Sequence, residues 1–197
     1  MKRNIFFSFI LFISTSIVKA QNIQHLSVDI SNPTSFYCTQ KQSNWCWAAC
    51  NQMLLNSQNI SESQENQVVK LFGQLINKGA GGDYELAKLA LAGTYTTSSG
   101  TTVKIIPYIS YLGTHTNDPV VIINKLKQGI PLVMATRMHG RICVGIDYDT
   151  DGYVYQVTRI RLLNPASSET VETISMLQLL DKRFEGGLTG FMTFEIH

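Results

Sequence analysis

Cys46 is the residue of this chain best placed to act as a nucleophile. It stands near the start of the run WCWAACNQMLLN, whose composition and apolar spacing predict a buried helix with Asn44 as its cap. At a helix start, free backbone N–H groups and the helix dipole stabilise an anion, which lowers the pKa of a thiol. Cys50 lies one turn further on, gains little from this effect and is predicted to be a core residue.

The two tryptophans of the chain, Trp45 and Trp47, bracket Cys46 and leave a second interpretation open. In that interpretation the thiol is an inert member of a buried aromatic cluster, because free cysteine packs as a small hydrophobic residue. Position alone does not decide between the two. The nucleophile hypothesis therefore needs a base.

His139 is the strongest candidate for that base. His25 lies in an irregular N-terminal segment and His115 lies in a polar loop, whereas His139 lies between two stretches with strand composition. The edge of a strand holds a side chain rigidly beside a cleft. A histidine at such a place is also common as a structural residue, so the assignment depends on a partner.

The hairpin around residues 151–152 supplies a candidate partner. An Asp-Gly pair between β-rich runs predicts a two-residue type I′ turn, and that turn sets His139 opposite Asn164. Opposed side chains share a face about 5 Å apart. The Asn164 carboxamide is therefore predicted to hold the tautomer of the imidazole. The alternative for Asn164 is a turn-starting residue before proline.

The run QKQSNWCW, from Gln40 to Trp47, resembles the nucleophile region of papain-like cysteine peptidases. It is similar to bacterial members, including plant-pathogen avirulence effector peptidases and the peptidase-C39-like group. In the family, a glutamine six residues before the nucleophile donates to the oxyanion, and a tryptophan commonly follows the cysteine. Gln40 and Trp47 occupy those two places.

The rest of the family pattern extends to the second half of the chain. In papain, glycine and an apolar residue follow the catalytic histidine six residues on, as Gly145 and Ile146 follow His139 here. The resemblance implies a Cys46–His139–Asn164 triad with Gln40 in the oxyanion hole. It also implies an enzyme that hydrolyses peptide bonds in a protein or peptide substrate, without a cofactor. Gly140-Arg141 replaces the small apolar pair common after the histidine of papain.

The elements expected from the sequence give an α+β fold of the papain-like kind, with a helical N-terminal half packed on an antiparallel β-sheet half. A capping-box pattern at 61–64 predicts a second helix through Asn77, and Asp83 is the expected cap of a third that Gly93 closes. Asp118-Pro119 opens a fourth. Strands are expected over 103–112, 131–138, 141–149, 153–163 and 190–197, and a last helix over 174–182.

Length and composition indicate one exported domain. Residues 1–20 have the positive start, the short apolar stretch and the small final residue of a signal peptide, which leaves 21–197 as a single domain. Without Lys2, Arg3 and Lys19, 13 basic residues face 14 acidic ones. This charge balance does not indicate a nucleic-acid-binding protein, and the sequence contains no basic run that would. We expect a secreted or periplasmic monomer without stable membrane association after cleavage.

Two other functional classes remain open. The first is another acyl-transfer enzyme with the same triad, such as a transglutaminase or an amidase; transglutaminases generally lack a glutamine at the place of Gln40. The second is a non-catalytic binding domain in which a disulfide engages Cys46, since four cysteines are present and export exposes them to oxidation. The cysteine spacing and the absence of an H-E-x-x-H motif argue against a zinc site.

Overall fold

The computed structural model describes residues 22–81, 84–110 and 119–197. These residues form an α+β fold, as expected, in which the strands make one antiparallel sheet. In chain order the elements are β1 (Gln24–Asp29), η1 (Pro33–Phe36), α1 (Cys46–Asn56), α2 (Gln64–Phe72), α3 (Glu85–Leu91), β2 (Gly93–Thr96), β3 (Thr102–Ser110), α4 (Pro119–Lys127), β4 (Leu132–Thr136), β5 (Gly140–Thr150), β6 (Tyr155–Leu163), β7 (Val171–Ser175), α5 (Met176–Leu180) and β8 (Leu188–Ile196).

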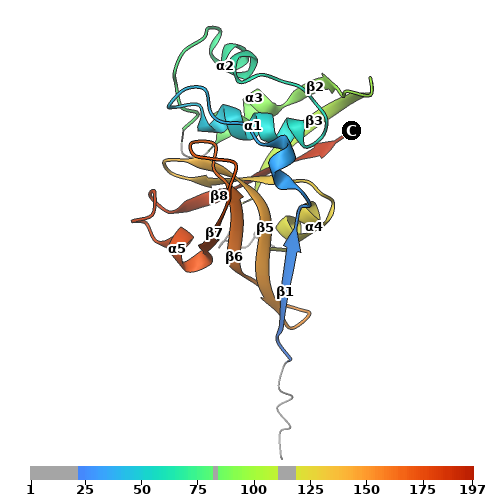
Figure 1. Cartoon of the computed structure of the whole chain (residues 1–197), viewed down its shortest axis with the longest axis vertical. Helices are drawn as coiled ribbons and strands as arrows, with labels where there is room; N and C mark the ends of the chain where they lie inside the picture. The colour runs from blue at the N-terminus through green and yellow to red at the C-terminus, as the bar shows by residue number, and fades with distance from the viewer. Residues whose placement is uncertain (1–21, 82–83, 111–118) are drawn as a thin grey trace, which may run out of the picture.

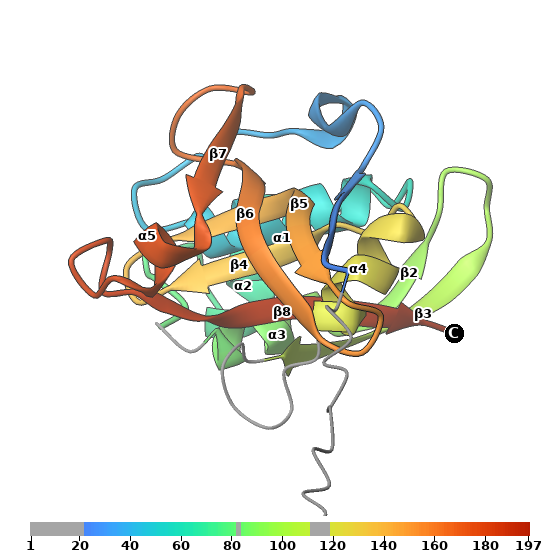
Figure 2. The ribbon, with the colours of Figure 1, turned by 90° about the horizontal axis from the view of Figure 1, so that it is seen from below.

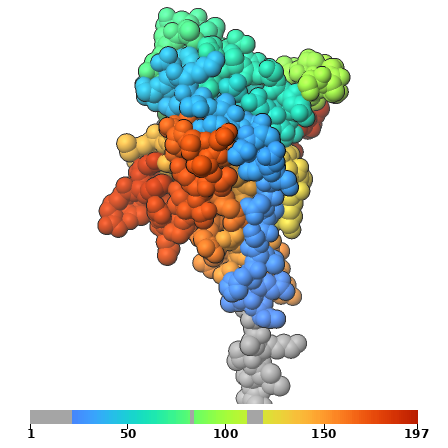
Figure 3. Space-filling view, in the orientation of Figure 1, coloured from blue at the N-terminus to red at the C-terminus, as the bar shows by residue number. Residues whose placement is uncertain are grey.

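The sheet runs in the order β2-β3-β8-β4-β5-β6-β7. Strand β5 is its longest member: β6 pairs along one edge, while β4 and then β1 pair along the other. Figures 1 and 2 show α1, α2 and α3 at one face of this sheet and α4 at the other. In the space-filling view the N-terminal helical residues cap one end of the molecule, above the sheet residues (Figure 3).

Side chains alternate between two apolar cores, one on each face of the sheet. Along β4, Val133 and Ala135 pack with α1 and α3, whereas Leu132 and Met134 pack with α4. This period of two is a property of any strand, and burial on both faces explains why β4 is apolar throughout. The strand next to the catalytic candidates is therefore held from both sides.

Helix α1 is buried on almost every side, which accounts for its run of alanine, leucine, methionine and cysteine. Its polar residue Asn51 is fully buried and donates from Nδ2 to the Ala87 carbonyl at 2.9 Å. Gln67 of α2 donates to the Ala48 carbonyl at 3.2 Å. These bonds join the three N-terminal helices and fix the helix that begins with Cys46.

Several predicted helix boundaries are wrong. Asn44 does not cap α1: the N-cap is Trp45, and the Asn44 side chain donates instead to the Asn77 carbonyl. Helix α2 starts at Gln64 because the Ser63 hydroxyl, two residues after the predicted cap, accepts the Asn66 N–H.

Helix α2 also ends before the predicted Asn77. Gly73 adopts φ 71°, the left-handed conformation that closes helices, and its N–H bonds to Val69. The third helix ends at Leu91 with Ala92 as its C-cap, ahead of the predicted Gly93. Its predicted cap Asp83, the cap Asp118 and the signal segment 1–20 lie outside the described residues.

The expected strands are all present, but the hairpin between β5 and β6 differs from its prediction. Thr150 pairs with Tyr155, so the loop has four residues and not two. The reason is the Asp151 carboxylate, which accepts the N–H groups of Tyr153 and Val154 at 2.8 Å and so closes a longer turn. Strands β2 and β7 were not predicted. Within the described ranges no helix has the length and apolarity needed to cross a bilayer.

Candidate active site

Cys46 is the first residue of α1. None of the described side chains caps this helix start, which leaves the first N–H groups directed to the space around the sulfur. The Cys46 side chain is partly exposed, whereas Cys50 is fully buried. The chain thus presents a thiol, and the positive end of a helix dipole, at the floor of a cleft.

Both tryptophans beside Cys46 anchor the opposite wall of that cleft. The Trp45 indole donates to the Ile76 carbonyl at 2.9 Å, and the Trp47 indole donates to the Lys78 carbonyl at 3.0 Å. These bonds hold the chain that leads into residues 79–81, which line the cleft. Both tryptophans are buried, as the second interpretation expects, and their bonds hold a segment that lines the cleft around the thiol.

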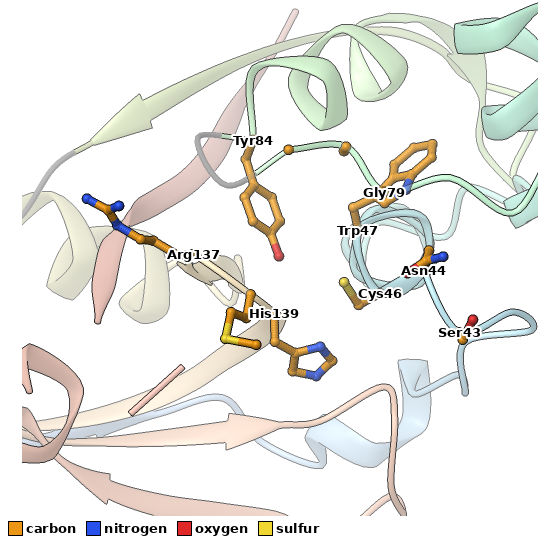
Figure 4. A pocket seen from close by; sticks show the side chains of 11 residues that line it. Ser43, Asn44, Cys46, Trp47, Gly79, Tyr84, Arg137 and His139 are labelled. Carbon is orange, nitrogen blue, oxygen red and sulfur yellow. The ribbon is translucent and has the colours of Figure 1, made fainter. Parts of the chain in front are cut away.

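His139 lies in the tight connection between β4 and β5. Thr136 defines this connection: its backbone N–H and its hydroxyl both lie 2.9 Å from the His139 carbonyl oxygen, and its hydroxyl oxygen accepts the His139 N–H at 3.0 Å. In Figure 4 the Cys46 sulfur points to the side of the cleft where the His139 ring lies. The backbone of the base is thus fixed from the sheet.

Asn164 follows the last residue of β6 and contacts the His139 ring. Its Oδ1 lies 2.8 Å from His139 Nε2 and also accepts the Ala166 N–H at 3.0 Å, while its Nδ2 donates to Glu172 Oε1 at 3.3 Å. These two neighbours fix which end of the carboxamide faces the imidazole. Nε2 is then the protonated nitrogen, and Nδ1 is left to face the thiol.

The pKa of the Cys46 thiol is lowered and that of the His139 imidazole is raised, which favours an ion pair between them. Burial by itself raises the pKa of the Cys46 thiol, but hydrogen bonding from the His139 ring and the Gly140 backbone outweighs burial and lowers it. Burial lowers the pKa of His139, and its bonds to Cys46 and Asn164 outweigh that effect and raise it. A thiolate and an imidazolium are therefore favoured together.

The other three cysteines show the opposite behaviour. Burial raises the pKa of Cys38 to about 11 and of Cys143 to about 12, and it raises that of Cys50 well above the ordinary range. All four cysteines lie among the described residues and all are free. Cys46 alone combines partial exposure with a lowered pKa.

Gln40 lies beside the cleft but is not one of its lining residues. Its Nε2 donates to the carbonyls of Gln42 and Ser43 at 3.0 and 3.1 Å, and its Oε1 is buried without a hydrogen-bond partner. Two carbonyl acceptors occupy both N–H bonds of the amide. Gln40 can donate to an oxyanion only by releasing one of them.

The cleft between helix and sheet encloses about 190 Å³. Apart from Cys46 and His139, its described lining has one charged side chain, that of Arg137, and no acidic one. The lining comes from both halves of the chain: Ser43, Asn44, Cys46, Trp47, Gly79, Ala80, Gly81, Tyr84, Arg137, Met138 and His139. Met138 is 76% exposed although it is apolar.

Tyr84 is a residue of this site that the sequence did not indicate. It is buried, has φ 59° and directs its hydroxyl into the cleft toward Cys46 (Figure 4). A Cβ on Gly140 would lie 2.1 Å from the Tyr84 hydroxyl oxygen, so the glycine after His139 makes room for the phenol. Hydrogen bonding from Tyr84 contributes to the lowered pKa of Cys46.

In comparisons with known proteins, no family model matches this chain and none of the curated proteins matches its sequence.

Proposed function

We propose that this protein is a secreted cysteine peptidase with a papain-like fold, in which Cys46 is the nucleophile and His139 the proton-transfer partner. The observation that carries the proposal is the 2.8 Å contact between His139 Nε2 and Asn164 Oδ1 on the sheet side of a cleft whose helix side presents Cys46. A helix that starts with the thiol, facing a sheet whose connections carry the imidazole and the carboxamide, supports the proposal of a Cys-His-Asn triad.

The first chemical step follows from the charges in the cleft. The Cys46 thiolate attacks the acyl carbon of a peptide bond, and the carbonyl oxygen takes up the negative charge. The N–H groups at the start of α1, which none of the described side chains caps, can donate to it. Gln40 joins them when its amide gives up the Ser43 carbonyl. Loss of one such donor costs about 2.7–4 kcal/mol in other hydrolases.

His139 carries the proton through both halves of the reaction. Its Nδ1–H passes to the leaving amine as the C–N bond breaks, which leaves an acyl group on the Cys46 sulfur. The same nitrogen then takes a proton from water, whose oxygen attacks the thioester and releases the acid. Asn164 keeps Nε2–H engaged throughout, so the ring does not turn away between the two transfers.

The partially exposed cleft suits a protein or peptide segment as substrate. We propose that the chain acts outside the cytoplasm as a monomer, after removal of residues 1–20.

The other three thiols are compatible with an oxidising compartment. They are buried or partly buried and have raised pKa values, so only a small share of each is ionised at neutral pH: Cys38, Cys50 and Cys143. They resist oxidation better than an exposed thiolate would.

The proposal is tested by incubating the protein with an unfolded protein substrate and a peptide library, with and without a primary amine. New carboxyl termini identified by mass spectrometry are the expected product. Cys46→Ala abolishes turnover and leaves the fold intact, because the helix does not need the thiol.

The matched control is Cys38→Ala, which removes a thiol whose pKa is raised. It retains activity. Turnover that survives Cys46→Ala would contradict the nucleophile assignment. Incorporation of the amine in place of hydrolysis would instead favour a transferase with the same triad. A Cys46 found in a disulfide in the non-reduced protein would favour a binding domain.

A further inference from the structure

Arg141 is a buried cation two residues after the proposed base. It lies at the start of β5 with 6% of its surface exposed, and its guanidinium stacks 5.5 Å from the Phe184 ring. A buried charge needs partners, since its removal from water is unfavourable unless ion pairs and hydrogen bonds compensate for it. The partners of Arg141 are two carboxylates, and each of them leads back to His139.

The first carboxylate holds the ring of His139. Glu172 of β7 lies 3.6 Å from Arg141 Nε through Oε2, within ion-pair range, and accepts the Asn164 Nδ2–H through Oε1 at 3.3 Å. Asn164 in turn contacts His139 Nε2. The position of the Asn164 amide therefore depends on a carboxylate that Arg141 attracts.

The second carboxylate holds the backbone of His139. Glu185 accepts two hydrogen bonds from Arg141, at 2.6 Å from Nη1 and 2.7 Å from Nη2, and lies 3.0 Å from the Thr136 hydroxyl. The charged acceptor makes the stronger bond for the single hydroxyl proton, which leaves the hydroxyl oxygen to accept the His139 N–H. Glu185 has φ 49°, a left-handed conformation that is unfavourable for a non-glycine residue.

The contacts form a closed circuit that starts and ends at His139: the ring, Asn164, Glu172, Arg141, Glu185, Thr136 and the His139 backbone. We propose that Arg141, acting through Glu172 and Glu185, is the positioning residue that sets the orientation of His139 in the Cys46–His139 pair. This inference rests on the proposed function. It assigns a role to Arg141, the second of the two residues after His139 that depart from the papain pattern.

The direction in which Cys46 reactivity changes when Arg141 is lost distinguishes a positioning role from a purely electrostatic one. A guanidinium near an imidazole lowers the pKa of the imidazole, and Arg141 acts on His139 in this direction. If charge were its whole role, loss of Arg141 would strengthen the ion pair and make Cys46 more reactive at low pH. If Arg141 positions the ring, its loss weakens the pair and makes Cys46 less reactive.

The test measures the rate of Cys46 alkylation by iodoacetamide against pH in the purified protein. Arg141→Lys keeps the charge but cannot bond Glu185 with two N–H groups while it reaches Glu172. In this variant we expect the acid limb of the pH–rate profile, the range in which the alkylation rate rises as the Cys46 thiol ionises, to move up by about one pH unit. The alkylation rate at pH 6 should then fall about tenfold, since one pKa unit is a tenfold change in the thiolate fraction. Glu172→Ala shifts the limb in the same direction.

Conservative and distant variants complete the design. Glu172→Gln keeps an oxygen acceptor for Asn164 and recovers part of the shift, which a general loss of stability would not do. Arg161→Lys is the matched control, because Arg161 also bridges two carboxylates, Asp29 and Asp147, but away from the cleft. We expect Arg161→Lys to keep the wild-type pH profile of Cys46 alkylation.

The possible outcomes are distinct. If Arg141→Lys fails to fold, Glu172→Ala and Glu172→Gln still decide the question, because Glu172 is a partly exposed residue on an edge strand. An unchanged limb in the folded Arg141 and Glu172 variants would overturn the positioning role and leave the peptidase proposal standing. An ordinary thiol limb in the wild-type protein would overturn both.

Discussion

The two sides of the cleft are held in place by different forces. Cys46 belongs to a helix packed almost wholly by apolar side chains and a few hydrogen bonds to backbone carbonyls. His139 belongs to a short connection held by hydrogen bonds and three charged side chains. The nucleophile needs only a fixed place at a helix start, whereas the base needs a fixed ring orientation and tautomer, which directional bonds supply.

This contrast predicts that substitutions on the two sides will have different consequences. Removing apolar contacts below Cys46 should lower the free energy of unfolding and leave the pKa of the thiol in the folded protein unchanged. Truncating Asn164 or Glu172 beside His139 should change reactivity more than stability, because both side chains are partly exposed and the cores remain intact.

His139→Ala has the largest expected effect on turnover. It removes both the partner that lowers the pKa of Cys46 and the group that moves the proton, and loss of such a group costs about 10²–10⁴-fold. Asn164→Ala keeps the imidazole and is expected to lose less. The measurement is kcat/KM for peptide hydrolysis by the two variants. An equal or larger loss in Asn164→Ala would mean that its orienting role is misassigned.

Leu54→Ala tests the nucleophile side. Leu54 is fully buried in α1, so truncation leaves a cavity and lowers the free energy of unfolding by about 2–5 kcal/mol. Urea unfolding gives the stability, and alkylation at pH 6 gives the thiol reactivity of the folded protein. A large drop in reactivity without unfolding would show that packing and thiol chemistry are coupled, against the contrast drawn above.

Tyr84→Phe should have the smallest effect, because the phenol is one of several groups that lower the pKa of Cys46. Loss of one hydrogen bond to the thiolate raises that pKa and slows alkylation at pH 6 by about tenfold or less. The full pH profile measures the shift. A faster rate than wild type would indicate that the phenol blocks the sulfur and does not stabilise it.

The fold class and most strands could be predicted from the sequence, and so could the proximity of Cys46, His139 and Asn164. The predicted register was wrong even though the contact between His139 and Asn164 is present. The observed register, extended past Ile142 and Leu163, sets Ala166 opposite His139, and Asn164 reaches the ring from a position outside β6. Turn length depended on one carboxylate, which pattern alone does not reveal.

The remaining features of the site depend on contacts between distant segments. Arg141, Glu172 and Glu185 are ordinary charged residues in the sequence. The pairing of β5, β6 and β7 brings Arg141 and Glu172 near His139, and the pairing of β4 with β8 brings Glu185 there. The bonds of Gln40 to its own loop, and the left-handed conformation of Tyr84, likewise leave no periodic signal in the chain. Family resemblance indicated where Gln40 stands but not what its amide contacts.

The central claim is an ion pair between Cys46 and His139, and limited alkylation at pH 6 tests it most directly. Folded protein is treated with a small amount of iodoacetamide, and the label is mapped by mass spectrometry in the wild type and in His139→Ala. Ordinary thiols, with a pKa of about 8.5, are almost fully protonated at this pH. We predict fast labelling confined to Cys46 that disappears without His139. Slow labelling, or equal labelling of Cys46 and Cys38, would contradict the account.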